Sequence, residues 1–335
     1  MPIPGLGHRS YLQIGPKETT YGTFQTPTKK LELISWNIAP DIGVINDPSL
    51  YNQQSQRALY QGPLLYRGTF VVRANYEGIL LELLRGVTGT YTSAVVDTSA
   101  RDHFFKEGPT LNSYSFEVIL GDVPSGTSKC WRLLGAKVLN LSYKIKAAKG
   151  DGGMGTIEFT VLAKDMISGQ TPTGALSFPA NFPPLFHQCI TADDGTADAV
   201  GSVRVRGLEV TLENPHADDR LYLGSLNIDE PLRNGFLKAR YKLEQEFITA
   251  TQWDAARAFT VGSPQFIFQH PTLVGATTAK REFEFRSNQA NLTEFTAPIS
   301  DYGIMVSTAT WEAFFDPTDV SAIVVRVRNA DVALP

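Results

Sequence analysis

The residues that most often carry enzyme chemistry are present in this chain, but they form no recognisable catalytic pattern. Five histidines occur, each without a serine motif, a cysteine partner or a second histidine at metal-ligand spacing. They are His8, His103, His187, His216 and His270. Carboxylate pairs such as Glu244 with Glu246 cannot be assigned to a shared cleft. We therefore predict that the protein is not an enzyme and uses no cofactor.

Two segments have the composition of a ligand-binding loop. Gly150–Gly155 is rich in glycine, but it lacks the Lys-Ser/Thr step of a phosphate-binding loop and stands between two strand patterns, so we predict a hairpin turn. Asp193–Asp198 offers several oxygen atoms but lacks the later glutamate of a calcium loop, which favours an exposed turn. Cys130 and Cys189 are the only cysteines, and we expect two buried free thiols. No metal site is predicted.

Length and composition indicate an ordinary folded protein. The 335 residues exceed the usual length of one domain, and 42% hydrophobic with 19% charged residues can form a sizeable core. The formal net charge of −4 argues against a surface that binds nucleic-acid phosphates. The longest apolar stretch, Gly78–Leu84, contains Glu82 and is far shorter than the ~20 residues of a membrane helix. We therefore expect no membrane span. The chain also opens without the pattern of a secretory signal.

A set of strand and helix patterns recurs in the same order in the two halves of the chain. Each half shows an alternating strand, a strand that leads into a helix, a further strand and a closing strand pair. In the first half these are residues 30–38, 68–86, 115–120, 135–145 and 156–165, and in the second half 203–212, 237–259, 282–286, 303–313 and 321–331. We predict two related domains, at residues 1–167 and 185–335, joined by a Pro/Gly-rich connector at 168–184.

Each predicted domain is mainly β. Alternating strands have one apolar face that must be covered, so we expect two tandem β-sandwiches or partly closed barrels, each with one flanking α-helix.

Residues 10–23 contain a short strand followed by the phrase Glu-Thr-Thr-Tyr-Gly-Thr. This N-terminal region resembles the opening of the tail tube proteins of long-tailed, siphovirus-like bacteriophages. The resemblance continues through Asp47–Leu50, through residues 77–85 and through Gly135–Val138. The second half matches more loosely, as a repeat of the same unit, which is the arrangement of the two-domain type.

This resemblance implies a structural protein of the virion that is assembled in the host cytoplasm. Subunits would close into rings whose inner sheets form one β-barrel, and the rings would stack into a hollow tube through which phage DNA passes without being specifically bound. Single-domain members build hexameric rings, so two domains per chain predict a homotrimeric, pseudo-hexameric ring. Further partners implied are tape-measure and tail-terminator or tip proteins.

The resemblance also suggests where such a protein would carry its functional residues. Acidic side chains on alternating strands are candidates to face the lumen, although the same side chains would equally suit a solvated outer face. The long polar segment 40–63 and the N-terminal arm around Ile3–Gly15 are candidates to contact a neighbouring ring, the alternative for the segment being a mobile surface loop. The lumen candidates are Glu32, Glu209, Glu213, Glu282 and Glu284; the loop candidates are Asp47, Tyr51, Asn52, Gln53, Gln54, Gln56 and Arg57; and the arm candidates are Tyr11 and Gln13.

A second class of function stays open at this point. The four tryptophans Trp36, Trp131, Trp253 and Trp311 could form the sugar platform of a carbohydrate-binding or adhesin-type β-sandwich. They stand within apolar alternation, which favours packing in the core. A third possibility, an enzyme on a β scaffold, lacks a nucleophile or metal constellation.

Overall fold

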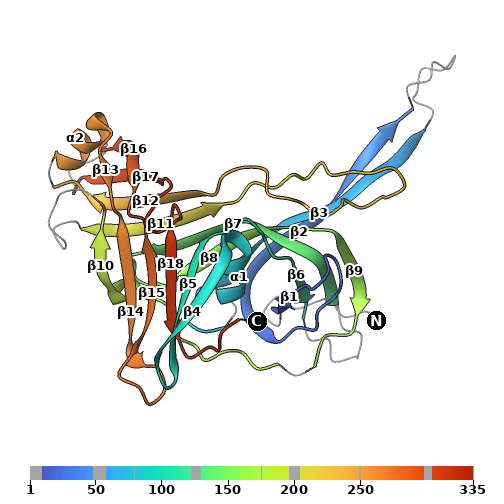
Figure 1. The fold of residues 1–335 in the computed structure, drawn as a ribbon, viewed down its shortest axis with the longest axis horizontal. Coiled ribbons are helices and arrows are strands. Elements are labelled where there is room, and N and C mark those ends of the chain that lie inside the picture. Colours follow the sequence, from blue (N-terminus) through green and yellow to red (C-terminus); the bar gives the residue numbers. More distant parts are fainter. Residues whose placement is uncertain are drawn as a thin grey trace.

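A computed structural model describes residues 10–47, 58–78, 80–121, 130–174, 176–195, 204–248, 250–297 and 304–334. Two β-sheets and two short helices make up most of these residues (Figure 1). The first half contains β1 (Tyr11–Lys17), β2 (Lys29–Asn46), β3 (Leu59–Arg73), α1 (Leu80–Thr88), β4 (Gly89–Asp97), β5 (Ala100–Glu107), β6 (Tyr114–Ile119), β7 (Cys130–Lys146), β8 (Thr156–Ala163) and β9 (Asp165–Gln170). The second half contains β10 (Cys189–Asp193), β11 (Val205–Glu213), β12 (Lys238–Glu246), α2 (Thr251–Ala258), β13 (Val261–Gly262), β14 (Gln265–Leu273), β15 (Lys280–Arg286), β16 (Ala290–Thr296), β17 (Val306–Ala313) and β18 (Val324–Asn329).

A closed barrel forms in the first half. Its strands follow the order β7-β6-β1-β2-β3-β8, and pairing between β7 and β8 closes the circle. The barrel encloses a stack of aromatic rings. The ring centroid of Phe70 lies 5.3 Å from that of Phe159 and 6.1 Å from that of Phe116. All three side chains are fully buried. The alternation seen in the sequence thus produces one apolar interior.

The barrel wall continues into the second half through β7. Residues 140–146 of β7 pair with β11, so the wall runs on as β11-β12-β17-β16. The four wall strands of the first half have the order β7-β8-β3-β2, and those of the second half the order β16-β17-β12-β11. Each set consists of the two strands that precede the helix, β2 and β3 or β11 and β12, and of a later hairpin, β7 and β8 or β16 and β17. The same local arrangement therefore occurs twice.

The second sheet also combines both halves. Its six strands follow the order β10-β14-β15-β18-β5-β4, and β18, near the end of the chain, pairs with β5 of the first half. The sequence comparison expected β17 and β18 to pair with each other as β7 and β8 do, and this was wrong because they belong to different sheets. The hairpin that takes the place of β7–β8 in the second half is β16–β17. The expected match of residues 115–120 with 282–286 was also wrong, since β6 belongs to the barrel and β15 to the six-stranded sheet.

The space between the sheets is filled by aromatic and aliphatic side chains. Tyr143 of β7 packs against Phe283 and Phe285 of β15, with ring centroids 5.1 and 5.2 Å apart. Helix α1 is almost entirely buried and packs on β7, whereas α2 packs on β16 and leaves Trp253 half exposed. The prediction of a mainly β fold with two helices is confirmed.

The structure confirms some of the predictions made for short segments and single residues and contradicts others. Gly150–Gly155 does join two paired strands, as predicted. Asp194 was expected in an exposed turn, but it is buried and accepts a hydrogen bond from Gln252. Of the tryptophans, Trp311 is fully buried as expected, whereas Trp253 is exposed.

Candidate functional site

The large sheet has one face that is apolar and one that is polar. On β11, Val210 and Leu212 point into the core and are fully buried, while Glu209 and Glu213 point to the opposite side. The neighbouring strands alternate in the same way, so Lys144 on β7 and Arg240 on β12 lie beside these glutamates. Two of the five predicted lumen residues therefore share the polar face of one continuous sheet.

This polar face carries both signs of charge, and several of its cations are paired. Lys144 lies 2.8 Å from a carboxylate oxygen of Glu158 and 3.4 Å from one of Glu209, which keeps the pKa of Lys144 above its ordinary value. The guanidinium of Arg240 lies 4.0 Å from the carboxylate of Glu213. Two further pairs are Arg240 with Glu312 at 2.7 Å and Lys146 with Glu244 at 2.7 Å, while Lys238 and Lys242 of β12 are exposed on the same face. The face expected to be acidic is instead a ladder of cross-strand ion pairs.

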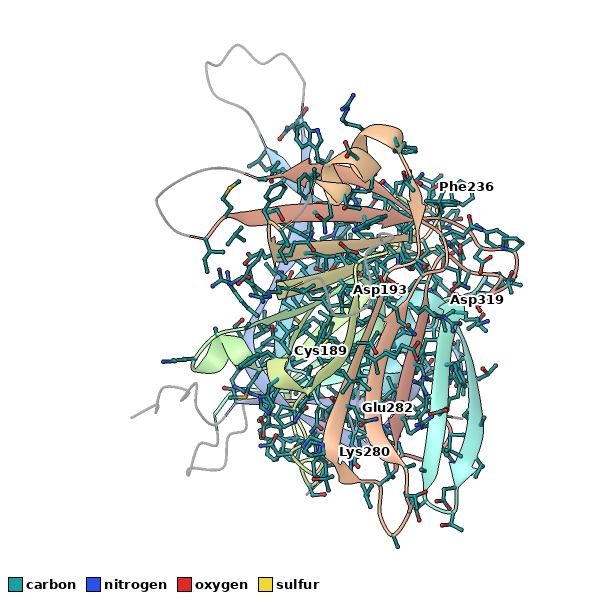
Figure 2. The ribbon with its side chains drawn as sticks, turned by 90° about the vertical axis from the view of Figure 1, so that its left-hand side faces the viewer. Cys189, Asp193, Phe236, Lys280, Glu282 and Asp319 are labelled. Atoms are coloured by element: carbon teal, nitrogen blue, oxygen red, sulfur yellow. The ribbon has the colours of Figure 1, made fainter. Side chains whose placement is uncertain are left out.

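Glu282 and Glu284 lie on the other sheet. Both are on β15 and point away from Phe283 and Phe285, toward the outer face of the six-stranded sheet, where Figure 2 labels Glu282. Glu32 lies on β2, and its side chain is exposed. The five glutamates chosen from the sequence are therefore not brought together.

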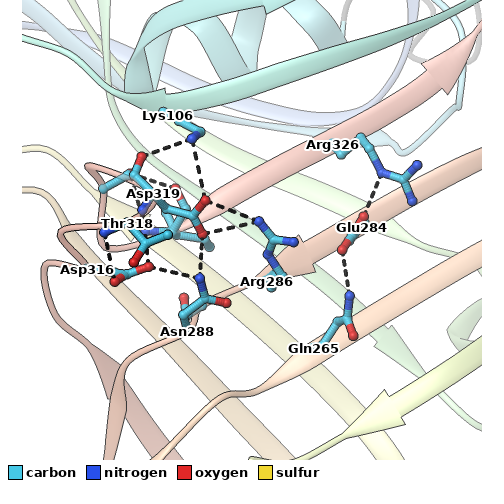
Figure 3. A network of polar contacts seen from close by, with 12 residues as sticks. Lys106, Gln265, Glu284, Arg286, Asn288, Asp316, Thr318, Asp319 and Arg326 are labelled. Carbon is cyan, nitrogen blue, oxygen red and sulfur yellow. Dashed lines mark hydrogen bonds and ion pairs between the residues drawn. The ribbon is translucent and has the colours of Figure 1, made fainter. Parts of the chain in front are cut away.

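The two β15 glutamates are held in a dense network. Arg326 of β18 donates to Glu284 over 2.6 Å and lies 2.9 Å from Glu282, and Gln265 also donates to Glu284 (Figure 3). Arg328 makes two hydrogen bonds to Asp102 of β5, at 2.7 and 2.9 Å. Because these contacts cross four neighbouring strands, their main effect is to fasten the first half of the chain to the second.

A second cluster on this side fixes the turn between β17 and β18. Asp319 accepts hydrogen bonds from Arg286 and Asn288, and Asp316 accepts one from Asn288 over 2.8 Å (Figure 3). Both carboxylates are thus occupied by donors from the protein. No group of three or more residues in the described ranges could hold a metal ion.

The segment predicted as the loop 40–63 is largely a hairpin, so that prediction was wrong in its secondary structure. β2 continues to Asn46 and β3 begins at Leu59, and beyond the body the two strands pair with each other as a projecting arm of residues 41–46 and 59–65 (Figure 1). The sequence of residues 41–46 shows no alternating strand pattern, because both faces of this part of β2 are exposed. Of the loop candidates, Asp47 directly follows β2 and is the last described residue there, while Tyr51, Asn52, Gln53, Gln54, Gln56 and Arg57 lie outside the described residues.

Tyr11 and Gln13 were expected in a free N-terminal arm, but they lie in β1. This strand pairs with both β2 and β6, and Gln13 is buried on the side of β1 opposite to the core residues Leu12 and Ile14. The first described part of the N-terminal region is therefore a barrel strand, and residues 3–9 lie outside the described ranges. The connector predicted at 168–184 likewise begins within β9, and its other described residues have no helix or strand.

Sequence reasoning missed the segment between β11 and β12. It runs beside the arm (Figure 1), where the backbone N–H of Leu64 donates to the carbonyl of Leu226 over 2.9 Å and Arg67 pairs with Asp218. The arm and this segment together expose apolar side chains: Ile42, Val44, Ile45, Leu59, Tyr60, Leu221, Tyr222, Leu223 and Leu226. The run Leu-Tyr-Leu-Gly-Ser-Leu in a stretch without strand alternation was the available signal.

The large sheet ends in two edges that lack a described partner. At one end, β2 pairs with β1 only as far as Glu32, so the outer edge of residues 33–46 meets no described strand. At the other end, β13 pairs with Ala290 and Asn291 of β16, and no described strand pairs with the outer edge of residues 292–296. Open edges of this kind favour pairing with another chain.

The fold and its surfaces define a β-rich protein with an open, two-edged wall and a projecting apolar arm. The chain belongs to a family described as phage tail tube protein, whose sequence pattern matches residues 7–313. Its location is accordingly the tail of a virion. None of the curated proteins matches the sequence. Among the described residues, no helix is long and apolar enough to cross a membrane.

Proposed function

We propose that three copies of this chain close into a ring and that these rings stack into the tube that conducts phage DNA. Each chain contributes two tube domains, one from each half, and the protein acts as a structural component without catalysis. The observation that carries this proposal is the eight-stranded run β2-β3-β8-β7-β11-β12-β17-β16, which has an open edge at both ends. Three such runs give a 24-stranded barrel and leave no open edge in the ring.

The polar face of the large sheet is the proposed lumen wall, with Glu209 and Glu213 lining it. Lys144 and Arg240 on the same face are each paired with carboxylates, which reduces the positive charge that they offer to DNA phosphates. The exposed Lys238 and Lys242 of β12 lie opposite Glu213 and Glu209, so their charge is offset by the facing carboxylates. DNA can then slide past the wall without being held. In this arrangement Glu282 and Glu284 lie on the outside of the ring, where they stabilise the six-stranded sheet.

The projecting arm of residues 41–46 and 59–65 is the proposed contact between stacked rings. It leaves the sheet at the end where β8 finishes at Ala163. A groove between the sheets opens at the opposite end, beside the start of β11 and the end of β7, and its apolar lining is Phe186, Cys189, Val205, Leu208, Phe266 and Phe268. A stack of identical rings brings the arm of one copy to the grooved end of the next, where exposed apolar surface on both sides would be buried.

Tape-measure and tail-terminator or tip proteins are the further proposed partners, and membership of the tail tube family supports them.

The experiment combines native mass spectrometry with electron microscopy of the purified protein. A ring with three times the mass of the chain, together with hollow tubes at high concentration, is the expected result. A monomer at every concentration and salt tested would overturn the proposal. Rings of six chains would overturn the trimer and with it the assignment of two tube domains to each chain.

A further inference from the structure

The two halves of the chain meet in the large sheet where β7 pairs with β11. This internal junction provides a template for the contact between two copies. Resting on the proposed ring, we infer that β16 of one copy pairs antiparallel with β2 of the next, with Leu292 opposite Ile38 and Phe295 opposite Trp36. The occupant of each open edge is thus a second copy of this chain in one defined register. The register follows from comparing the two sets of wall strands.

The middle strands of the two sets establish which residues correspond. Phe70 of β3 lies opposite Phe159 of β8, and Tyr241 of β12 lies opposite Trp311 of β17. All four are fully buried aromatic side chains in the same position of the strand order. Phe70 therefore corresponds to Tyr241, and Phe159 corresponds to Trp311.

The outer strands follow from these anchors. On one side Trp36 lies opposite Phe70 and Val210 lies opposite Tyr241, so Trp36 of β2 corresponds to Val210 of β11. On the other side Leu141 lies opposite Phe159 and Leu292 lies opposite Trp311, so Leu292 of β16 corresponds to Leu141 of β7. Both outer strands thus have a counterpart of known pairing.

Within the chain, the β7–β11 pairing places Leu141 opposite Leu212 and Tyr143 opposite Val210. Ile38 stands two residues after Trp36, as Leu212 does after Val210, so Leu292 meets Ile38 of the next copy. Phe295 takes the position of Tyr143, because Phe295 lies opposite Ala309 in the same way that Tyr143 lies opposite Ile157. The register shift between Leu292 and Glu294 accounts for the one extra residue in β16.

The residues at the two open edges are less buried than their counterparts at the internal junction, as expected if a neighbouring strand is missing. Val210 and Leu212, which pack at the internal junction, are fully buried. Their counterparts Trp36 and Ile38 are only half buried, although both face the apolar side of β2. Phe295 is likewise only partly buried, where Tyr143 has no exposed surface. Adding the neighbouring strand would bury these apolar side chains and complete the core across the junction.

The strands on which the two helices pack support the same correspondence. α1 packs on β7 and also contacts β11 across the internal junction. α2 packs on β16, and Trp253 of α2 makes an edge-on contact with Phe295 while half of its own surface stays exposed. In the proposed register α2 reaches β2 of the next copy, as α1 reaches β11. β13 covers Ala290 and Asn291, so pairing between copies begins at Leu292.

A disulfide cross-link tests the register. Asn37 and Glu294 correspond to Thr211 and Ser142, whose hydroxyl oxygens lie 3.3 Å apart across the internal junction. The double variant Asn37→Cys/Glu294→Cys should therefore lose its monomer band on a non-reducing gel after mild oxidation and give linked dimers and trimers. A disulfide needs Cα atoms within about 7 Å of each other, so a shift of two residues along one strand prevents it.

Two matched variants provide the control, Ser35→Cys/Glu294→Cys and Ala39→Cys/Glu294→Cys, along with each single cysteine. The native Cys130 and Cys189 are retained in all of them. Rings seen before oxidation, with cross-linking faster in a control pair than at 37 and 294, would overturn the register and leave the ring intact. Cross-linking by Asn37→Cys alone would show that β2 pairs with β2, which also overturns it. If no ring forms before oxidation, the ring proposal and this inference both fail.

Discussion

The Glu18 carboxylate accepts a hydrogen bond from the backbone N–H of Gly135 over 2.9 Å. The same carboxylate accepts hydrogen bonds from the N–H of Gly22 and from the hydroxyls of Ser113 and Ser115, at 2.7 to 2.8 Å. Gly135 has a φ of 63°, and a Cβ there would lie 2.8 Å from the ring of Tyr21. Two sequence segments that resemble the tail tube family, residues 18–23 and 135–138, thus meet at one carboxylate.

Replacing Glu18 with alanine should destabilise the fold. Four donors lose their acceptor in a partly buried site, so the free energy of unfolding should fall by about 2–4 kcal/mol. Chemical denaturation followed by tryptophan fluorescence measures this change. The control Glu32→Ala removes an exposed glutamate from β2 and should change the free energy by less than about 0.5 kcal/mol. Equal effects of the two substitutions would show that the Glu18 contacts contribute little.

Reversing charge on the proposed lumen wall should make assembled rings retain DNA. The variant Glu209→Lys/Glu213→Lys adds two cations and removes one carboxylate partner each from Lys144 and Arg240. Retention of double-stranded DNA should appear at low salt and weaken steeply as salt rises, because phosphate binding releases counterions. Filter binding at several salt concentrations measures it, on rings whose mass has been checked.

The matched control for the lumen is Asp97→Lys/Asp254→Lys, which makes the same change in net charge on β4 and α2. This variant should bind less DNA inside the tube than the lumen variant. Equal retention by both variants would mean that net charge, rather than the polar face of the large sheet, controls DNA binding.

A charge on the arm should separate ring formation from stacking. Val44 is more than half exposed, so Val44→Glu should change the free energy of unfolding by less than about 0.5 kcal/mol. Its burial between rings would be unfavourable because the carboxylate must lose water. Rings of normal mass with few or short tubes in electron micrographs are expected. Asn46→Glu, which adds the same charge on the arm without removing an apolar side chain, should shorten tubes less. Tubes of normal length from Val44→Glu would contradict the stacking role.

Acidification should destabilise the protein through His216. Burial lowers the pKa of His216 to about 4, while its Nδ1 is hydrogen-bonded to the carbonyl of Asn214 and Lys137 and Arg233 add positive charge nearby. The unfolded chain takes up this proton near pH 6.5, so between pH 6.5 and 4 the unfolded state binds more protons and stability falls with falling pH. Above pH 6.5 this residue contributes no pH dependence.

The measurement is the free energy of unfolding at pH 7 and pH 4.5 for the parent and for His216→Gln. His103 is also buried with a lowered pKa and responds to pH in the same direction, so the difference between the two proteins isolates His216. The parent should lose about 2 kcal/mol more than the variant over this interval. Equal losses would show that folding does not lower the pKa of His216.

Part of the strand and helix order could be predicted from the sequence because it depends on local patterns. Alternation around Phe70 and Val210 identified strands, and the apolar stretch near Leu80 identified a helix. Alternation failed for the arm, because both faces of residues 41–46 are exposed and their sequence therefore has no apolar period to detect. Of the lumen candidates, Glu209 and Glu213 share the polar face of the large sheet, whereas Glu282 and Glu284 lie on the six-stranded sheet, and a lumen role for the first two stays a prediction.

Glu209 and Glu284 show what each level of structure determined. In the sequence both glutamates alternate with apolar residues, and this alone determined that each lies on the polar face of a strand. Only the tertiary structure decided that β11 joins the large sheet and β15 the six-stranded sheet. The reason is physical: alternation specifies which side of a strand faces the core, whereas the neighbour of a strand depends on contacts between residues far apart in the chain, such as Val327 with His103.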